Sequence, residues 1–341
     1  MIIVPASEHP WPLWRKVLFR FFFIYLLLQL APWTWLDTIP GVGYVTQYFS
    51  KAFTWVVESA NRYLFHIRPV LIPPNGSGDT SYGWAEVCTY LLLALIGAAT
   101  WTVIDRKRRS YDVADYWLRT FVRYFIATTA FTYGIIKIFA LQMVFPNLSQ
   151  LATPLGDFLP MRFSWLFIGY STPYQVFSGI FETIAGLLLL NRRTVTLGLL
   201  VAAGVFTNVV LLNLSYDIPV KIFSSHILIY IIYLLAHDWK RLTAFFVFNQ
   251  PVQPTHLYDA VYSKRWSRYT RIGIKVLFVI LSVILPVINS YQQYKNYYTV
   301  EEPKPIRREM TNSLVLLRAM APIIATPAAQ AVAWLDRAVS P

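Results

Sequence analysis

The chain has 341 residues, of which 56% are hydrophobic and 14% are charged, and its formal net charge is +13. Soluble domains carry about 25% charged residues, so this composition excludes an ordinary soluble protein and predicts an all-α integral membrane protein. The positive charge does not indicate a nucleic-acid partner, because Lys and Arg gather at the ends of hydrophobic runs, where the positive-inside rule accounts for them.

Seven hydrophobic stretches are long enough to cross a bilayer, since a helix needs about 20 mostly apolar residues to span about 30 Å of hydrocarbon. We therefore predict about seven transmembrane helices, at about 17–36, 85–104, 117–140, 171–190, 195–214, 219–237 and 272–288.

The distribution of Lys and Arg predicts the orientation. With the N-terminus inside, the cytoplasmic flanks carry fifteen of these residues, whereas the three outer loops carry four. This asymmetry predicts a multi-pass protein of the bacterial cytoplasmic (inner) membrane, with its N-terminus inside and its C-terminus outside.

Two regions outside the predicted spans also have helical patterns. Between Tyr44 and Arg62, apolar residues recur at helical spacing with Lys51 and Glu58 among them, which predicts an amphipathic helix lying on the outer membrane surface. In the tail after Glu301, a further helical stretch is predicted at about 312–320. The lipid bilayer is thus one predicted partner.

The stretch 171–190 has Glu182 near its centre. A carboxylate at bilayer depth costs at least about 2.5–3.5 kcal/mol, so it normally faces the protein interior and suggests a functional site. A structural polar contact is the alternative, and Gly179 and Gly186 would let another helix approach closely. If no cation lies beside it, a buried Glu182 should be protonated near neutral pH. Glu182→Gln should then be mild if the role is structural, and should abolish activity if Glu182 shuttles protons.

Asn208 and His226 lie at similar depth in the next two spans. If they share a site with Glu182, Glu182 and His226 are the candidate catalytic groups, because a histidine can relay protons or bind a quinone oxygen. Asn208 could instead join helices, and His226 could be a buried histidine with its hydrogen bonds satisfied. His226 has no second histidine at matching depth, so the pattern does not favour intrinsic haem, and no metal site is predicted.

Other polar residues fall in the middle-to-outer half of the same four spans. Lys137 is near the outer end of its span and could turn inward or reach the outer surface or Asp217, whereas Arg119 and Arg123 are expected to reach the cytoplasmic headgroups. Asp217 is a plausible N-cap for the sixth span and should pair with the residue four positions later. The predicted ligand-binding residues are therefore Lys137, Asn208, Asn213, Asp217 and Lys221.

The runs that carry these residues also resemble a known family. Phe177 to Gly198, Thr207-Asn208-Val209 and Asn213 to His226 look like the long bacterial members of the DoxX family, named for a small membrane subunit of a thiosulfate:quinone oxidoreductase. The resemblance implies a DoxX-like four-helix transmembrane bundle over about 117–242. It would be flanked by an N-terminal membrane region (1–116) and by a region with a cytoplasmic loop, the last helix and an outer tail (243–341).

Two functions follow with equal weight. The first is the membrane module of a quinone-linked oxidoreductase, with quinone as the candidate cofactor and a partner subunit supplying the redox group. The second is an accessory or structural subunit of a larger complex with other membrane or periplasmic subunits. A small-solute transporter ranks below both, because no inverted repeat or pair of broken helices is evident.

Overall fold

The computed structural model describes residues 2–3, 10–32, 43–76, 78–259, 261–262 and 265–299. The chain divides into two units, Met1–Ser290 and Tyr291–Pro341. In the described part, helices account for all regular structure except an antiparallel pair of two-residue strands, β1 (Ile2–Ile3) and β2 (Val261–Tyr262). The prediction of an all-α membrane protein is confirmed at this level.

Four helices of the first unit form a closed bundle. α4 (Asp112–Ile138) packs against α7 (Thr172–Leu190), α7 against α8 (Val195–Ser215), α8 against α9 (Lys221–Ala236), and α9 returns to α4. Buried apolar side chains from all four helices pack into one core along the bundle. Core side chains from the four helices include Ile126, Phe131, Ala185, Leu189, Leu199, Ala202, Ile227 and Ile231.

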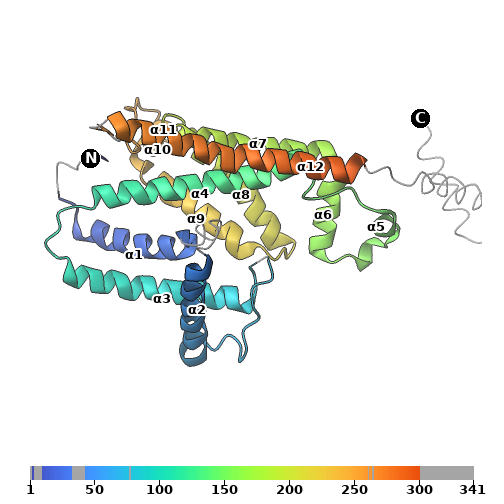
Figure 1. The fold of residues 1–341 in the computed structure, drawn as a ribbon, viewed down its shortest axis with the longest axis horizontal. Helices are drawn as coiled ribbons and strands as arrows, with labels where there is room; N and C mark the ends of the chain where they lie inside the picture. Colours follow the sequence, from blue (N-terminus) through green and yellow to red (C-terminus); the bar gives the residue numbers. More distant parts are fainter. Residues whose placement is uncertain are drawn as a thin grey trace, which may run out of the picture. The chain divides into compact units, whose positions relative to one another are not determined.

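Two further helices flank this bundle. α1 (Leu13–Leu30) packs against α3 (Ser81–Ile104) and also contacts α4. In Figure 1, α1 and α3 run alongside α4. Arg20 of α1 is buried between them, and its guanidinium donates to the Thr102 hydroxyl at 2.9 Å and the Asp105 carbonyl at 2.7 Å. Charge-assisted hydrogen bonds of this kind allow an arginine to be buried inside a helical protein.

A helix lies in each of the seven predicted spans, although α1 ends at Leu30 and the last part of the first span, 33–36, lies outside the described residues. Within the described residues, α3, α7, α8 and the run Arg265–Tyr298 are long and apolar enough to cross a membrane. The bent pair α9 and α10 (Trp239–Phe246), which meet at 80°, makes a fifth if it is one span. Charged residues in α1 and α4 reduce their apolar character, so the total of seven stays a prediction. The run Arg265–Tyr298 comprises α11 (Arg265–Val279), a π-helical segment (Ile280–Ile284) and most of α12 (Leu285–Thr299).

The predicted amphipathic helix is present as α2 (Gly43–Ala60), followed by a π-helical turn, Asn61–Phe65. α2 contacts α3 and runs across the direction of α1 and α3 in Figure 1, as a surface helix should if α3 crosses the membrane. Its side chains Tyr44, Tyr48 and Trp55 are 75%, 69% and 69% exposed. The helix predicted at about 312–320 lies outside the described residues.

Two short helices precede α7. α5 (Leu148–Ala152) begins with a capping box in which Asn147 and Gln150 exchange side-chain and backbone hydrogen bonds. After a 3₁₀ turn, Leu155–Asp157, the helix α6 (Pro160–Tyr170) starts with a proline in its first turn, where no amide hydrogen is needed. α6 packs against α7, so this segment lies at the end of the bundle that the charge pattern predicts to be outer.

Candidate functional site: a polar cavity in the four-helix bundle

A buried ion pair joins α4 and α7. The Lys137 ammonium donates a hydrogen bond to Oε1 of Glu182, and the two residues are 7% and 1% exposed. Lys137 therefore turns inward, which sequence reasoning left open, and it does not pair with Asp217. A buried carboxylate and a buried ammonium each carry a large desolvation cost, so removing either partner would leave an uncompensated charge inside the protein.

Two glycines bring the helices close enough for this pair. A Cβ atom at Gly134 would lie 2.8 Å from the Gly179 carbonyl oxygen, and one at Gly179 would lie 2.6 Å from the Gly134 carbonyl oxygen. The Cβ atom added at Gly179 would also lie 2.8 Å from Cβ of Lys137, so the lysine side chain begins beside Gly179. From there the side chain extends about one helical turn along α7 to Glu182. Gly186, also expected to allow close approach, faces the ring of Phe131 on α4.

Glu182 and Lys137 line a cavity of about 480 Å³ enclosed by α4, α6, α7, α8 and α9. Asn208 and Asn213, both predicted as ligand-binding residues, line it as well. Asn213 donates to the Ser224 hydroxyl at 2.9 Å and is held in place, whereas Asn208 has an exposed side chain. Polar residues on its wall that sequence reasoning missed include Tyr133, Gln142, Ser164, Trp165, Ser178 and Ser224.

Three of the lining residues have a buried polar atom with no hydrogen-bond partner in the described part of the chain. These atoms are Oε2 of Glu182, Oε1 of Gln142 and Nε1 of Trp165. A buried polar group without a partner costs about 1–3 kcal/mol, so proteins rarely leave several around one cavity. The arrangement is suited to a ligand with one acceptor for the indole N–H and donors for the two oxygens.

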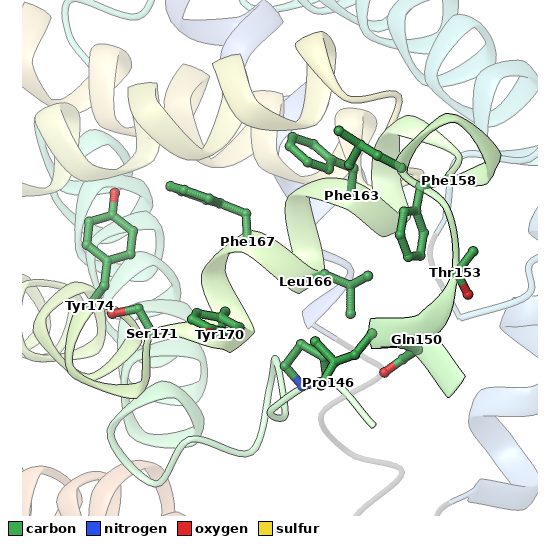
Figure 2. Close-up of a pocket in the computed structure, with 12 residues that line it drawn as sticks. Pro146, Gln150, Thr153, Phe158, Phe163, Leu166, Phe167, Tyr170, Ser171 and Tyr174 are labelled. Atoms are coloured by element: carbon green, nitrogen blue, oxygen red, sulfur yellow. The ribbon is translucent and has the colours of Figure 1, made fainter. Parts of the chain in front are cut away.

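A second, mostly apolar pocket of about 560 Å³ is shown in Figure 2. It is formed by α5, α6 and the start of α7, and Leu166 and Pro146 are among its apolar walls. The aromatic side chains of Phe163, Phe167 and Tyr174 line both spaces. The two pockets are therefore adjacent, and these three rings stand between an apolar chamber and the polar cavity.

His226 does not join the cavity. Its Nδ1 lies 2.7 Å from the Ile222 carbonyl oxygen, which can only accept, so Nδ1 carries the hydrogen. Nε2 then accepts from the Tyr25 hydroxyl of α1 at 2.7 Å. The prediction that Glu182, Asn208 and His226 share one network is wrong in this respect. Successive residues of a helix are about 100° apart, so His226 points away from the face on which Ser224 lines the cavity.

The expected pair of Asp217 and Lys221 forms at 2.6 Å, but neither residue lines the cavity. The Asp217 side chain is 84% exposed, so the ion pair contributes little to the free energy of unfolding. The prediction of Asp217 as N-cap is wrong, because α9 begins at Lys221 and Asp217 has a left-handed backbone conformation. Asp79, from the loop before α3, instead accepts from the amides of Lys221 at 2.7 Å and Ile222 at 2.9 Å.

Arg119 and Arg123 also differ from expectation. Their side chains are buried against other parts of the protein instead of extending outward, at 6% and 5% exposed. Arg119 donates to Asp115 at 3.0 Å and to the Leu257 carbonyl oxygen at 2.6 Å, contacts that a sequence pattern cannot show because Leu257 is 138 residues away.

Comparison with known proteins gives no description of activity. No protein-family model and no solved structure matches the chain. A stretch of 126 residues, 36% of this chain, is 32% identical to the uncharacterized protein YwoB of Bacillus subtilis (strain 168) and covers 79% of that protein. At this identity and coverage, the chain belongs to the same family as YwoB.

Proposed function

We propose that the protein is a DoxX-like membrane module of a quinone-linked oxidoreductase, and that its cavity binds the quinone head. The observation that carries this proposal is the set of three unpartnered polar atoms of Glu182, Gln142 and Trp165 around one cavity within the described residues. The proposal includes the orientation that the charge pattern predicts, with the cavity in the outer half of a bacterial cytoplasmic membrane.

The cavity offers complementary groups for both redox states of a quinone. A quinone carbonyl accepts hydrogen bonds. The Trp165 indole N–H is a donor, and it has no acceptor among the described residues. A quinol hydroxyl donates, and Oε2 of Glu182 and Oε1 of Gln142 can accept. Most ligand sites combine an apolar wall with a few placed polar groups, as this one does.

The adjacent apolar pocket suits the isoprenoid tail of such a ligand. Phe163, Phe167 and Tyr174 line both spaces, so a head in the polar cavity would leave its tail beside aromatic and aliphatic walls (Figure 2).

Reduction of a quinone to a quinol takes up two electrons and two protons. In this proposal the two electrons come from a partner subunit that carries a redox cofactor, and the two protons come from water and reach the quinone oxygens by way of Glu182 at the cavity wall. Lys137 holds Glu182 at the cavity by the ion pair, so the carboxylate that faces the ligand is fixed by a second residue rather than by the ligand itself.

The alternative, an accessory subunit without catalysis, is favoured by a different observation. Side chains of α11 and the following segment are exposed on an apolar helix, with Ile274 at 63%, Leu277 at 54% and Leu281 at 55%. Such a surface contacts lipid or another membrane chain. The two functions differ in whether the cavity binds quinone. A single experiment can distinguish them.

The test is purification of the full-length protein in a mild detergent with native lipid, followed by solvent extraction, quinone quantification and identification of co-purifying chains. We expect quinone near one molecule per chain, together with a subunit that carries a redox group. Quinone at or below the level of an unrelated membrane protein from the same membranes would overturn the proposal in favour of the accessory role.

The Trp165→Phe variant provides a more specific test of quinone binding, because phenylalanine keeps an aromatic ring but lacks the unpartnered N–H donor. Its affinity for a short-chain quinone should fall about tenfold, the effect of a lost buried hydrogen bond. Trp84→Phe is the matched control, since Trp84 is 48% exposed and does not line the cavity. Equal affinities of the two variants would show that the indole N–H does not contact the quinone.

A further inference from the structure

Arg123 of α4 is buried, and two of its three guanidinium nitrogen atoms have no hydrogen-bond acceptor among the described residues. It is 5% exposed, and its Nε and Nη1 atoms have no partner within the described residues. The guanidinium carbon lies 4.7 Å from the ring centre of Tyr124 and 4.8 Å from that of Tyr258. The two aromatic rings contact the guanidinium through cation–π interactions, which satisfy no N–H donor. An acceptor for these donors must therefore come from another group.

Arg20 shows how this fold satisfies a buried arginine with protein groups alone. It is 1% exposed, and its Nε donates to the Tyr111 hydroxyl at 3.0 Å. Its other nitrogens donate to Thr102 and Asp105. Arg123 is also buried, but its Nε and Nη1 have no such hydrogen bonds. Protein groups of the described residues therefore do not satisfy Arg123 as they satisfy Arg20.

The surroundings of Arg123 are positively charged. Lys275 is within electrostatic range of Arg123, Arg192 and Arg271. The carboxylates near Tyr258 and Arg192 are already engaged: Asp115 by Arg119 and His237, Asp238 by Arg241, and Asp259 by Arg192 at 2.9 Å and His256 at 3.0 Å. An excess of cations with their local carboxylates in use attracts an anion from outside the chain.

We propose that Arg123, with Tyr258 beside it, binds the phosphate group of a lipid headgroup or of a free phosphate. A guanidinium presents parallel N–H donors that match two phosphate oxygens, and this bidentate contact is stronger than a neutral hydrogen bond. The Tyr258 hydroxyl also has no partner among the described residues. Burial raises the pKa of Tyr258 to about 12, so the hydroxyl stays protonated at neutral pH and can donate as well.

This site is separate from the polar cavity. Arg123 precedes Lys137 by fourteen residues on α4, which is about 21 Å of helical rise, and it lies toward the end of the bundle predicted to be cytoplasmic. The inference therefore does not rest on the proposed quinone function. A phosphate group in the cytoplasmic headgroup layer lies at the depth where the positive-inside rule places the neighbouring cations.

The test measures binding to the full-length protein in an uncharged detergent, using three probes: dioctanoyl phosphatidic acid, dioctanoylglycerol and inorganic phosphate. We expect phosphatidic acid to bind at least about tenfold more tightly than dioctanoylglycerol, which has the same chains without the phosphate. Additional binding of inorganic phosphate would identify soluble phosphate as a source, whereas phosphatidic acid alone would identify a lipid headgroup. Failure of both phosphate-bearing probes to bind would overturn the proposal.

Arg123→Gln should weaken the binding of phosphatidic acid about tenfold or more, and Lys240→Gln, which removes an exposed cation of α10, should change it less than about twofold. If Arg123→Gln does not fold, Arg123→Lys keeps the charge without the planar donors, and Tyr258→Phe keeps the ring without the hydroxyl. Both should bind more weakly than the unchanged protein. Wild-type affinity in these variants would refute the assigned contacts.

Discussion

Lys137 and Glu182 form an ion pair across the interface of α4 and α7, with Oε1 of Glu182 accepting from the lysine and Oε2 left at the wall of the cavity. The pair therefore has two consequences. It joins the two helices inside the protein, and it fixes a carboxylate oxygen where a ligand can reach it.

The first prediction concerns the loss of one member of this pair. Glu182→Gln leaves the Lys137 ammonium buried without a counter-charge, so the free energy of unfolding in detergent should fall by about 3–5 kcal/mol. This revises the expectation that the substitution is mild for a structural role, which assumed no cation beside the carboxyl. Adding Lys137→Met should recover much of the loss, because the buried charge is then gone.

Asp217→Asn is the matched control for that measurement. It breaks the ion pair with Lys221, in which the aspartate side chain is 84% exposed, and should cost less than about 1 kcal/mol. If Glu182→Gln destabilises no more than Asp217→Asn, the buried pair does not stabilise the α4–α7 interface.

The second prediction concerns the glycines of the same interface. In Gly179→Ala the new methyl group would lie 2.6 Å from the Gly134 carbonyl oxygen, so the helices must separate and the unfolding free energy should fall by about 1–3 kcal/mol. Gly204→Ala in α8 is the control, because its added Cβ would meet nothing within 4 Å. That variant should be neutral or more stable by up to about 1 kcal/mol, since alanine favours helix. Equal effects would contradict the close approach.

The third prediction concerns the cap of α9. Asp79 accepts from the first two amides of the helix, and Asp79→Ala should lower the unfolding free energy by about 0.5–2 kcal/mol. Asp79→Asn keeps one oxygen acceptor and should lose less. Thermal unfolding of both variants in detergent checks the order, and a loss in the asparagine variant equal to that of alanine would indicate that charge, rather than the acceptor, is required.

The fourth prediction is the orientation in the membrane. In a background with Cys88 replaced by alanine, a cysteine introduced at Gly76 should react with an impermeant thiol reagent in intact cells, whereas one introduced at Ser263 should react only after lysis. The physical basis is the excess of Lys and Arg in the loops predicted to be cytoplasmic. The reverse labelling pattern would exclude an N-terminus on the inside.

Much of the architecture follows from the chain itself. Hydrophobic length and helical spacing were enough to predict a helix in each of the seven spans, within the described residues, and over the amphipathic stretch of α2. The spacing of Asp217 and Lys221 was enough to predict their ion pair, because residues four apart share one helix face. The depth of Glu182, Asn208 and Asn213 in their spans placed them on the wall of one cavity.

Only the tertiary structure decided which faces meet. Depth along a helix says nothing about rotation around it, so the sequence could not show that His226 faces Tyr25 of α1 while Ser224, two residues earlier, faces the cavity. Nor could it pair Lys137 with Glu182, or bring Asp79 to the amides of α9, because these contacts join segments 45 and 142 residues apart. Local spacing determined the helices, and the packing of distant helices determined the site.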